Sequence, residues 1–292
     1  AIGIGIGIGI PSGALNSNAA GAEVLRLISI LCSRATYCEN KTCTTAILEE
    51  IAAVRYIAPP LPVYTDNLVA SYSFDTDFSD YTGNNNLTAS GDATAGVAIG
   101  KVDKCADFDG SGDYALAVDS DDFSFTNGSN DLPFSVSLWV KLDVIPTVNK
   151  TIIGKEQSNQ NREWVVLYSP YTINGIQFTI RNAAGSEYIN LVDNTITYQT
   201  NTWYHFTFTY NGSELGSGLK CYRDGVLQSL TPVVVNYNGM TNTGSPLTIG
   251  GLSNAKWTDG KIDEVHVWKN RELTSAEVLD IYNTENAGNS IL

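Results

Sequence analysis

Alternating apolar and polar positions recur along the chain after residue 67 and predict β-strands. Successive strand side chains point to opposite faces, so alternation separates an inner face from an outer one. In the segment 134–142 the outer position is Trp139, and the inward positions are Phe134, Val136, Leu138, Val140 and Leu142. In the segment 203–210 the same rule opposes Tyr204, Phe206 and Phe208 to Trp203 and His205. Strands separated by turns rich in Gly, Asn and Asp are typical of a β-sandwich.

The segment 260–282 changes from strand periodicity to helix periodicity. Ile262, Val265 and Val267 alternate with polar residues, and then Leu273, Ala276, Val278, Leu279 and Tyr282 follow at helical spacing. Thr274 and Glu277 have the spacing of a capping box, in which each side chain bonds an otherwise unpaired amide at the helix start. We therefore expect a strand followed directly by a helix that begins near Thr274.

Six segments, taken in order, resemble the laminin-G-like or concanavalin A-like jelly roll. They are FDGSGDY at 108–114, FSVSLWVK at 134–141, WYHFTFTY at 203–210, KCYRDG at 220–225, PLTIGG at 246–251 and GKIDEVHVWKNRELTSAEVLDIY at 260–282. The resemblance implies a mainly β chain with an antiparallel β-sandwich over residues 67–284 and a short C-terminal tail at 285–292. It also implies that Trp139 and Trp203 are framework residues. The family is functionally diverse, so the fold alone does not name a function.

The first ten residues alternate Ile with Gly. An extended chain places Ile2, Ile4, Ile6, Ile8 and Ile10 on one face. Our hypothesis is that this strand is an anchor that adds to a sheet edge of another chain, where backbone hydrogen bonds and the Ile row would hold it. The alternative is an edge strand on this chain's own sandwich.

Residues 14–56 have helical periodicity in two stretches, one around Leu25 and one around Ile47. Prolines at positions 59, 60 and 62 end the second stretch and predict a stiff linker. We therefore expect an attachment segment of one strand and two helices at 1–58, a linker at 59–66, and then the sandwich.

The composition excludes some partners. A net charge of −14, from 17 basic and 31 acidic residues, gives no electrostatic footprint for nucleic acid or an anionic membrane surface. No apolar run reaches the length of about 18 residues that a membrane-spanning helix needs. The cysteines are Cys32, Cys38, Cys43, Cys105 and Cys221; the last two lie on expected strands, as buried thiols or as a bridge.

No enzyme signature is present. β-Glucan hydrolases of the resembled fold carry E-x-D-x-x-E on one strand, because retaining hydrolysis needs two carboxyl groups about 5 Å apart. The nearest segment, KIDEVH, has Lys261 and His266 where the two Glu would be. His205 and His266 have no nearby nucleophile signature, and we interpret them as structural.

The resemblance implies a structural Ca²⁺ ion near the junction of the first and last strands. Its candidate ligands are Asp75, Asp80, Asp263 and Asp109, whose carboxylates are the hard oxygen donors that Ca²⁺ prefers. The alternative is that these Asp residues cap turns.

Carbohydrate sites combine aromatic faces with amide and charged groups, because sugar rings offer C–H patches to stack on and hydroxyls to bond. One segment gathers such groups: Arg162, Trp164, Tyr168, Tyr171, Asn159 and Asn161. We expect them to line a glycan groove; the alternative is that the aromatic rings pack beneath a loop.

Together these patterns predict a non-enzymatic virion surface protein. The N-terminal segment resembles the anchors of phage head fibres, tail fibres and decoration proteins. We expect residues 1–58 to bind other virion proteins, the sandwich to bind a cell-surface glycan, and the chain to form a homo-oligomer. The alternatives are a purely structural virion component and a secreted bacterial adhesin in an extracellular location.

Overall fold

The computed structural model of the chain describes residues 64–157, 161–170 and 174–292. The chain divides into two compact units, residues 1–61 and 62–292, and the described residues all belong to the second. The predicted anchor residues, from Ile2 to Ile10, and both predicted N-terminal helices lie outside the described residues, as do Asn159 and Tyr171.

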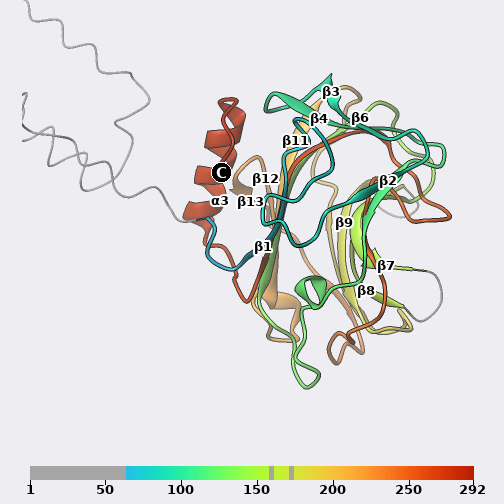
Figure 1. The fold of residues 1–292 in the computed structure, drawn as a ribbon. Helices are drawn as coiled ribbons and strands as arrows, with labels where there is room; N and C mark the ends of the chain where they lie inside the picture. Colours follow the sequence, from blue (N-terminus) through green and yellow to red (C-terminus); the bar gives the residue numbers. More distant parts are fainter. Residues whose placement is uncertain (1–63, 158–160, 171–173) are drawn as a thin grey trace, which may run out of the picture. The chain divides into compact units, whose positions relative to one another are not determined.

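Two antiparallel sheets form the sandwich (Figure 1), which confirms the predicted mainly β fold. In the first sheet the strand order is β13-β12-β11-β6-β16-β4-β3, with β1 also paired to β16. Its strands are β1 Leu68–Tyr72, β3 Thr94–Ile99, β4 Lys104–Asp109, β6 Phe134–Leu142, β11 Trp203–Tyr210, β12 Leu219–Arg223, β13 Val226–Leu227 and β16 Asp259–Lys269.

The second sheet has the order β14-β10-β9-β8-β7-β15-β5-β2. Its strands are β2 Thr88–Ser90, β5 Tyr114–Ala117, β7 Lys150–Glu156, β8 Arg162–Ser169, β9 Gly175–Arg181, β10 Tyr188–Asp193, β14 Val233–Val235 and β15 Leu247–Ile249. Two short 3₁₀ helices, η1 Asp121–Phe123 and η2 Gly216–Gly218, lie in loops.

The core between the sheets is apolar and rich in aromatic rings. All five predicted inward residues of β6 belong to it, which confirms the predicted alternation. Phe134 lies near its centre: its ring centroid is 3.8 Å from that of Phe125, 5.9 Å from that of Phe178 and 5.8 Å from that of Tyr210. Cys105 and Cys221 are free, buried thiols, so the two cysteines do not form a bridge.

The long strand β16 changes partner half-way along one edge. It pairs with β4 over Asp259–Ile262 and with β1 near Val265–Trp268, while β6 runs along its other edge. The β6 register shifts between Asp263 and His266, and Glu264 has a φ of 44°, in the left-handed region that few non-glycine residues adopt. This bulge lies where the three neighbouring strands meet, so it aims the Glu264 side chain differently from a regular strand.

The helix α3, Ser275–Asn286, follows β16 and covers the outer face of the first sheet (Figure 1). Thr274 caps it, and the capping box with Glu277 is present as predicted. Its buried residues are Val278, Ile281 and Glu285, whereas Leu279 is 45% exposed. The predicted apolar face of the helix was therefore wrong at Ala276 and Leu279, which are exposed, and it omitted Glu285. No helix in the described part of the chain has the length and apolar character needed to cross a membrane.

Candidate functional site

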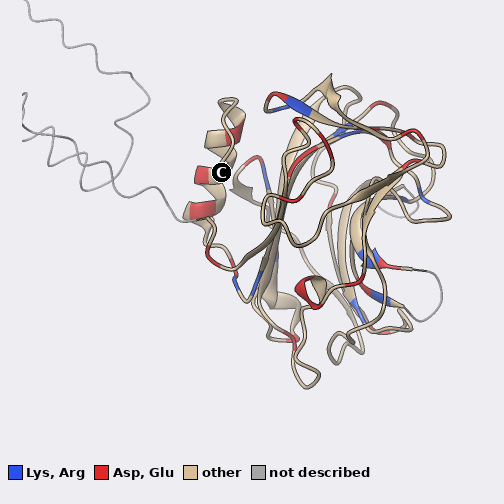
Figure 2. Cartoon of the chain, in the orientation of Figure 1, with Lys and Arg blue, Asp and Glu red and all other residues tan. Residues whose placement is uncertain are grey.

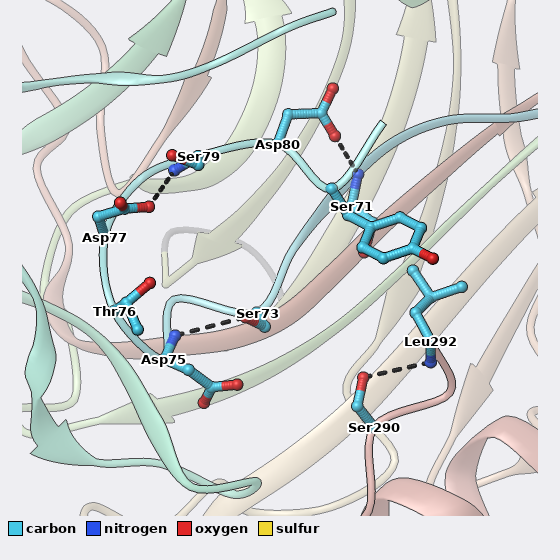
Figure 3. A pocket seen from close by; sticks show the side chains of 10 residues that line it. Ser71, Ser73, Asp75, Thr76, Asp77, Ser79, Asp80, Ser290 and Leu292 are labelled. Atoms are coloured by element: carbon cyan, nitrogen blue, oxygen red, sulfur yellow. Dashed lines mark hydrogen bonds between the residues drawn. The ribbon is translucent and has the colours of Figure 1, made fainter. Parts of the chain in front are cut away.

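A polar pocket of about 250 Å³ opens beside the loop that leaves β1. Figure 3 shows Asp75 and Thr76, from this loop, on one side and Ser290 and Leu292, from the C-terminal tail, on the other. We call it the β1-loop pocket; its lining residues are Ser71, Ser73, Asp75, Thr76, Asp77, Ser79, Asp80, Tyr81, Ser290 and Leu292.

The carboxylate of Asp80 holds the loop in shape. Its Oδ1 accepts hydrogen bonds from the amides of Ser71 (2.9 Å) and Thr82 (3.0 Å), and its Oδ2 accepts one from the amide of Asn85 (3.0 Å). Asp80 is only 5% exposed. The three amide bonds therefore replace the hydrogen bonds to water that the carboxylate loses on burial. The next residue, Tyr81, is tied through its amide to the carbonyl of Ser71 at 2.8 Å.

Tyr81 gives the pocket an aromatic surface. Its side chain is 66% exposed even though its backbone is fixed. Across the same lining, Asp77 is an exposed carboxylate whose pKa is lowered by hydrogen bonds from the hydroxyl and amide of Ser79. An exposed ring beside carboxylate and hydroxyl oxygens is the combination that stacks on and hydrogen-bonds a sugar.

A second polar pocket, of about 300 Å³, lies near Asp131 and Glu214. Asp131 is buried, and it accepts hydrogen bonds from the hydroxyls of Tyr210 and Tyr237 and from the amide of Met240. Burial raises the pKa of Asp131 although these bonds oppose the rise. The described lining of this pocket contains no aromatic residue, so it lacks a stacking surface.

The predicted glycan groove does not form around the β8 aromatic rings. Trp164 and Tyr168 are 0% exposed and belong to the core between the sheets, and the Trp164 Nε1 donates to the carbonyl of Phe123 at 2.9 Å. Strand alternation turns these two residues inward with Val166, which corrects the expectation that they line a surface.

The other two described residues of the predicted sugar site, Asn161 and Arg162, form hydrogen bonds with neighbouring loops. The Arg162 Nη1 donates to the carbonyl of Ala184 at 2.8 Å, and the carbonyl of Asn161 accepts from the hydroxyl of Ser245 at 2.6 Å. Asn161 is exposed and Arg162 partly exposed, but the described residues bring no exposed aromatic ring from β8 to them.

The four predicted calcium ligands mostly bond backbone amides. Asp75 accepts from the Lys104 amide at 3.0 Å, and Asp80 holds its own loop. Asp263 is fully buried and accepts from the amides of Lys101 (2.7 Å) and Val102 (3.0 Å). Its pKa is raised by burial although these amide bonds oppose the rise. Asp80 therefore caps its own turn, whereas Asp75 and Asp263 hold the distant loop 101–104 through its backbone amides.

Asp109, the fourth, lies elsewhere, in a mostly exposed group with Asp92 and Asp113 whose ligand atoms are within 4.8 Å of one another. Within the group, Asp113 accepts hydrogen bonds from the amides of Asp92 (2.8 Å) and Asp109 (3.0 Å). Asp75 and Asp80 share the β1-loop pocket, but the four residues do not form one cluster of carboxylates.

A second group of ionisable side chains is buried between β16 and α3. The ligand atoms of Glu264, His266 and Glu285 lie within 4.8 Å of one another, and all three residues are 0% exposed. The His266 Nε2 is 3.0 Å from the Glu285 Oε1 and 3.2 Å from the Glu264 Oε2. This set of two carboxylates and one imidazole is of a kind that could hold a metal ion. We call it the Glu-His-Glu cluster.

The two histidines beneath α3 differ in charge. Burial alone lowers the pKa of His266, but its hydrogen bonds to Glu264 and Glu285 outweigh burial and raise the pKa to about 9. Burial lowers the pKa of His205 to about 3, and the positive charges of His266 and Lys101 add to this effect. At neutral pH and without a metal, His266 is therefore the charged histidine and His205 the neutral one.

The Glu-His-Glu cluster lies against the wall of the β1-loop pocket. Ser71, which lines the pocket, has its Oγ 2.9 Å from the His266 Nδ1. Ser290, which also lines it, donates through its Oγ to the Glu264 Oε2 at 3.2 Å. These two serines thus connect an exposed polar pocket with a buried charged cluster.

The acidic surplus of the sequence is also spread well beyond these sites. Figure 2 shows Asp and Glu spread over α3 and many loops of the sandwich, with Lys and Arg dispersed among them.

The sequence of the sandwich also matches a known family. Residues 109–279 match the laminin G family described as the concanavalin A-like lectin/glucanases superfamily. The chain belongs to this superfamily. Members vary in chemistry, so membership confirms the fold predicted from the six segments and leaves the ligand to be argued from the site. No curated protein matches the chain.

Solved structures with a similar fold include complexes with sugars. Domain 4 of AbnA, an extracellular GH43 arabinanase from Geobacillus stearothermophilus in complex with arabinotriose, is 25% identical with a TM-score of 0.55; the match covers 74% of this chain and 98% of that domain. The binding domain of Paraclostridial Mosquitocidal Protein 1 is 17% identical with a TM-score of 0.58, covering 75% of this chain and 52% of that one.

The ligand-binding domain of botulinum neurotoxin serotype D, in complex with N-acetylneuraminic acid, is 16% identical with a TM-score of 0.55. The match covers 75% of this chain and 51% of the toxin domain. This chain therefore spans about half the length of the toxin binding domains, and at this identity the likeness concerns the fold alone.

Sequence reasoning missed Tyr81 and Glu285 as site residues. Tyr81 had a usable signal, because an aromatic residue inside the polar DYTGNNN loop has no strand or helix face on which to be buried. Glu285 lies seven residues after Val278 and four after Ile281, which is the spacing of one helical face, but its charge argued against a buried position.

Proposed function

We propose that the sandwich is a non-catalytic carbohydrate-binding domain and that the β1-loop pocket is its sugar site. The observation that carries this proposal is the exposed ring of Tyr81 in a pocket lined mainly by carboxylate and hydroxyl side chains. A sugar ring stacked on Tyr81 would place its hydroxyls toward the oxygens of Asp75 and Asp77.

The volume of the pocket sets the size of the ligand. At about 250 Å³ it lies just below the range of about 300–1,000 Å³ for sites that enclose drug-sized ligands. It therefore suits one sugar unit, with any further units of an oligosaccharide extending into solvent. Superfamily membership and the arabinotriose complex of the AbnA domain support a sugar as the ligand class.

A catalytic role has less support than binding. The sequence lacks the E-x-D-x-x-E strand of the glucan hydrolases, and its nearest segment carries Lys261 and His266 in place of two Glu. In the structure, His266 is fully buried, and its ring nitrogens contact the carboxylates of Glu264 and Glu285 and the hydroxyl of Ser71.

The wider proposal places this domain on a virion surface, held in a homo-oligomer by residues 1–58 and used for attachment to a host glycan. Its support is the Ile/Gly alternation and the order of parts in the sequence. A virion component without sugar binding and a secreted adhesin are the two competing functions. A test of sugar binding distinguishes the proposal from a virion component that binds no sugar.

The test is glycan-array binding by the full-length chain, followed by affinity measurement for the best ligand. We expect saturable binding, and about a tenfold loss in Tyr81→Ala, because losing one aromatic contact costs on the order of 1 kcal/mol. Tyr114→Ala is the matched control, since Tyr114 is a half-buried tyrosine of β5 outside both pockets. Unchanged affinity in Tyr81→Ala would place the sugar elsewhere, and an array without binding by folded protein would favour the structural role.

Calcium is a separate part of the proposal. Of its four expected ligands, Asp75 and Asp80 share the β1-loop pocket and are the pair placed to bind one ion, whereas Asp109 lies elsewhere. The same affinity is measured after EDTA treatment and after Ca²⁺ is added back. If Ca²⁺ acts at these residues, its return raises the midpoint of thermal unfolding, and Asp75→Asn removes the rise. Protein that responds to neither EDTA nor Ca²⁺ would leave these carboxylates as hydrogen-bond acceptors only.

A further inference from the structure

We propose that the Glu-His-Glu cluster is a binding site for a divalent transition-metal ion of the zinc type, with Glu264, His266 and Glu285 as ligands. This inference is independent of the sugar site. It concerns different residues from the four carboxylates named for calcium, and a different class of ion.

The first argument is geometric. In a tetrahedral zinc site, bonds of about 2.0 Å place the ligand atoms about 3.3 Å apart. The His266 Nε2 lies 3.0 Å from one carboxylate oxygen and 3.2 Å from the other, which requires only small movements to admit an ion between them. The imidazole nitrogen favours zinc and its neighbours over calcium, which takes oxygen ligands.

The second argument is an unpaired oxygen. The Glu264 Oε1 has no hydrogen-bond partner among the described residues, although the side chain is fully buried. A buried carboxylate oxygen without a partner is costly and uncommon in a folded protein. A metal bound by both carboxylate oxygens of Glu264 would supply the missing partner.

The third argument is charge. A divalent ion bound by both carboxylates and a neutral imidazole leaves the cluster without net charge. In that bound state the ion takes the lone pair of the Nε2, and any proton on this nitrogen passes to solvent.

The surroundings also suit a metal ligand. Metal-bound histidines commonly donate their other ring N–H to a neighbouring group, and the His266 Nδ1 lies 2.9 Å from the hydroxyl of Ser71. The Glu285 Oε2 accepts from the Nε1 of Trp139 at 2.7 Å, which fixes the carboxylate. Ser71 and Ser290 line the β1-loop pocket and also bond residues of the cluster.

A metal here would join α3 to the last strand. Glu285 comes from the end of the helix, and Glu264 and His266 come from β16. The ion would therefore stabilise the docking of the helix and, through Ser71 and Ser290, the wall of the pocket.

The test begins with full-length protein stripped of metal by EDTA and titrated with Zn²⁺ in a calorimeter. Exposed thiols are alkylated first, because Cys32, Cys38 and Cys43 offer competing zinc ligands. We expect one site per chain and a higher midpoint of thermal unfolding with Zn²⁺. Co²⁺ bound in place of Zn²⁺ should give the visible spectrum of a tetrahedral site with nitrogen and oxygen ligands.

Variants then locate the site. Glu264→Gln, His266→Gln and Glu285→Gln should each weaken Zn²⁺ binding at least about 100-fold, and Ser71→Ala, which removes only the orienting hydroxyl, about 10-fold. Glu163→Gln is the matched control, a fully buried carboxylate paired with Lys155 and outside the cluster. Asp109→Asn tests the exposed acidic group, and both of these variants should bind Zn²⁺ as the unaltered protein does.

Two results would overturn the proposal, and the first requires no variant. Unaltered, metal-free protein that shows neither stoichiometric Zn²⁺ binding nor a tetrahedral Co²⁺ spectrum would leave the cluster as a hydrogen-bonded imidazolium. Binding that survives in Glu285→Gln and is lost in Asp109→Asn would place the ion at the exposed aspartates.

Discussion

Two buried layers flank the first sheet, and they are made of different side chains. Between the sheets, the buried residues are almost all apolar, with Phe134 in contact with several other rings. Between that sheet and α3, apolar residues such as Trp268 and Ile281 share the space with fully buried polar ones, including His205, His266, Glu264 and Glu285. The same sheet therefore packs on one face by the hydrophobic effect and on the other partly by charge.

The two layers differ in which substitutions they tolerate. An apolar layer needs volume and shape, and exchanges of similar size usually cost little. A buried polar layer needs each of its hydrogen-bond partners. A carboxylate or imidazole that loses a partner still carries the free-energy cost of being removed from water. We therefore expect the sandwich to be sensitive to lost volume, and the layer beneath α3 to be sensitive to pH, metal and single polar atoms.

The largest expected effect is in the sandwich. Phe134→Ala removes a fully buried ring from the centre of the core and should lower the free energy of unfolding by about 3–5 kcal/mol. Denaturant unfolding, followed by tryptophan fluorescence, measures it. The loss should be nearly the same at every pH, because no charge is involved. Val118→Ala, at a position that is 77% exposed, is the control and should unfold as the unaltered protein does.

The next effect belongs to the layer beneath α3 in metal-free protein. The pKa of His266 is raised to about 9 in the fold, from about 6.5 in an unfolded chain. A raised pKa means that the folded state binds the proton more tightly. The stabilisation is thus complete below about pH 6.5, declines as the pH rises, and is lost above about pH 9, with a total on the order of 3 kcal/mol.

Denaturant unfolding across this pH range, with EDTA present, checks the prediction. The groups that face His266 are Glu264 on its own strand, Glu285 on α3 and the neutral His205 on β11. In His266→Gln the decline between about pH 6.5 and about pH 9 should disappear. Equal slopes in the two proteins would show that His266 does not carry the pH dependence.

The smallest effect concerns the start of α3. Thr274→Ala removes the side chain that accepts the Glu277 amide and should cost about 1 kcal/mol. Faster amide hydrogen exchange in the first turn of the helix would report it directly. Asn283→Ala, at an exposed position inside the same helix, is the control. An identical loss in both variants would mean that the cap contributes nothing specific.

The sequence predicted most of the sandwich, because alternation carries the needed information. Each inward residue of β6 was correct, and so was the start of α3, since a two-residue period and a capping box are local properties of the chain. The site residues were harder. Trp164 is surrounded in sequence by the amide, aromatic and charged residues of a typical sugar groove. Its position in the alternation of β8 nevertheless points the side chain into the core.

The chain by itself therefore determined the class of fold, the faces of its main strands and the C-terminal strand and helix. The tertiary structure decided which charges meet. Glu264 and Glu285 are 21 positions apart in sequence, and a bulge in β16 and the docking of α3 bring both carboxylates to His266. Ser71, far away in sequence, comes to the same imidazole through the pairing of β1 with β16. Periodicity reports which way a residue faces, whereas a site depends on which distant residues face one another, and only packing sets that.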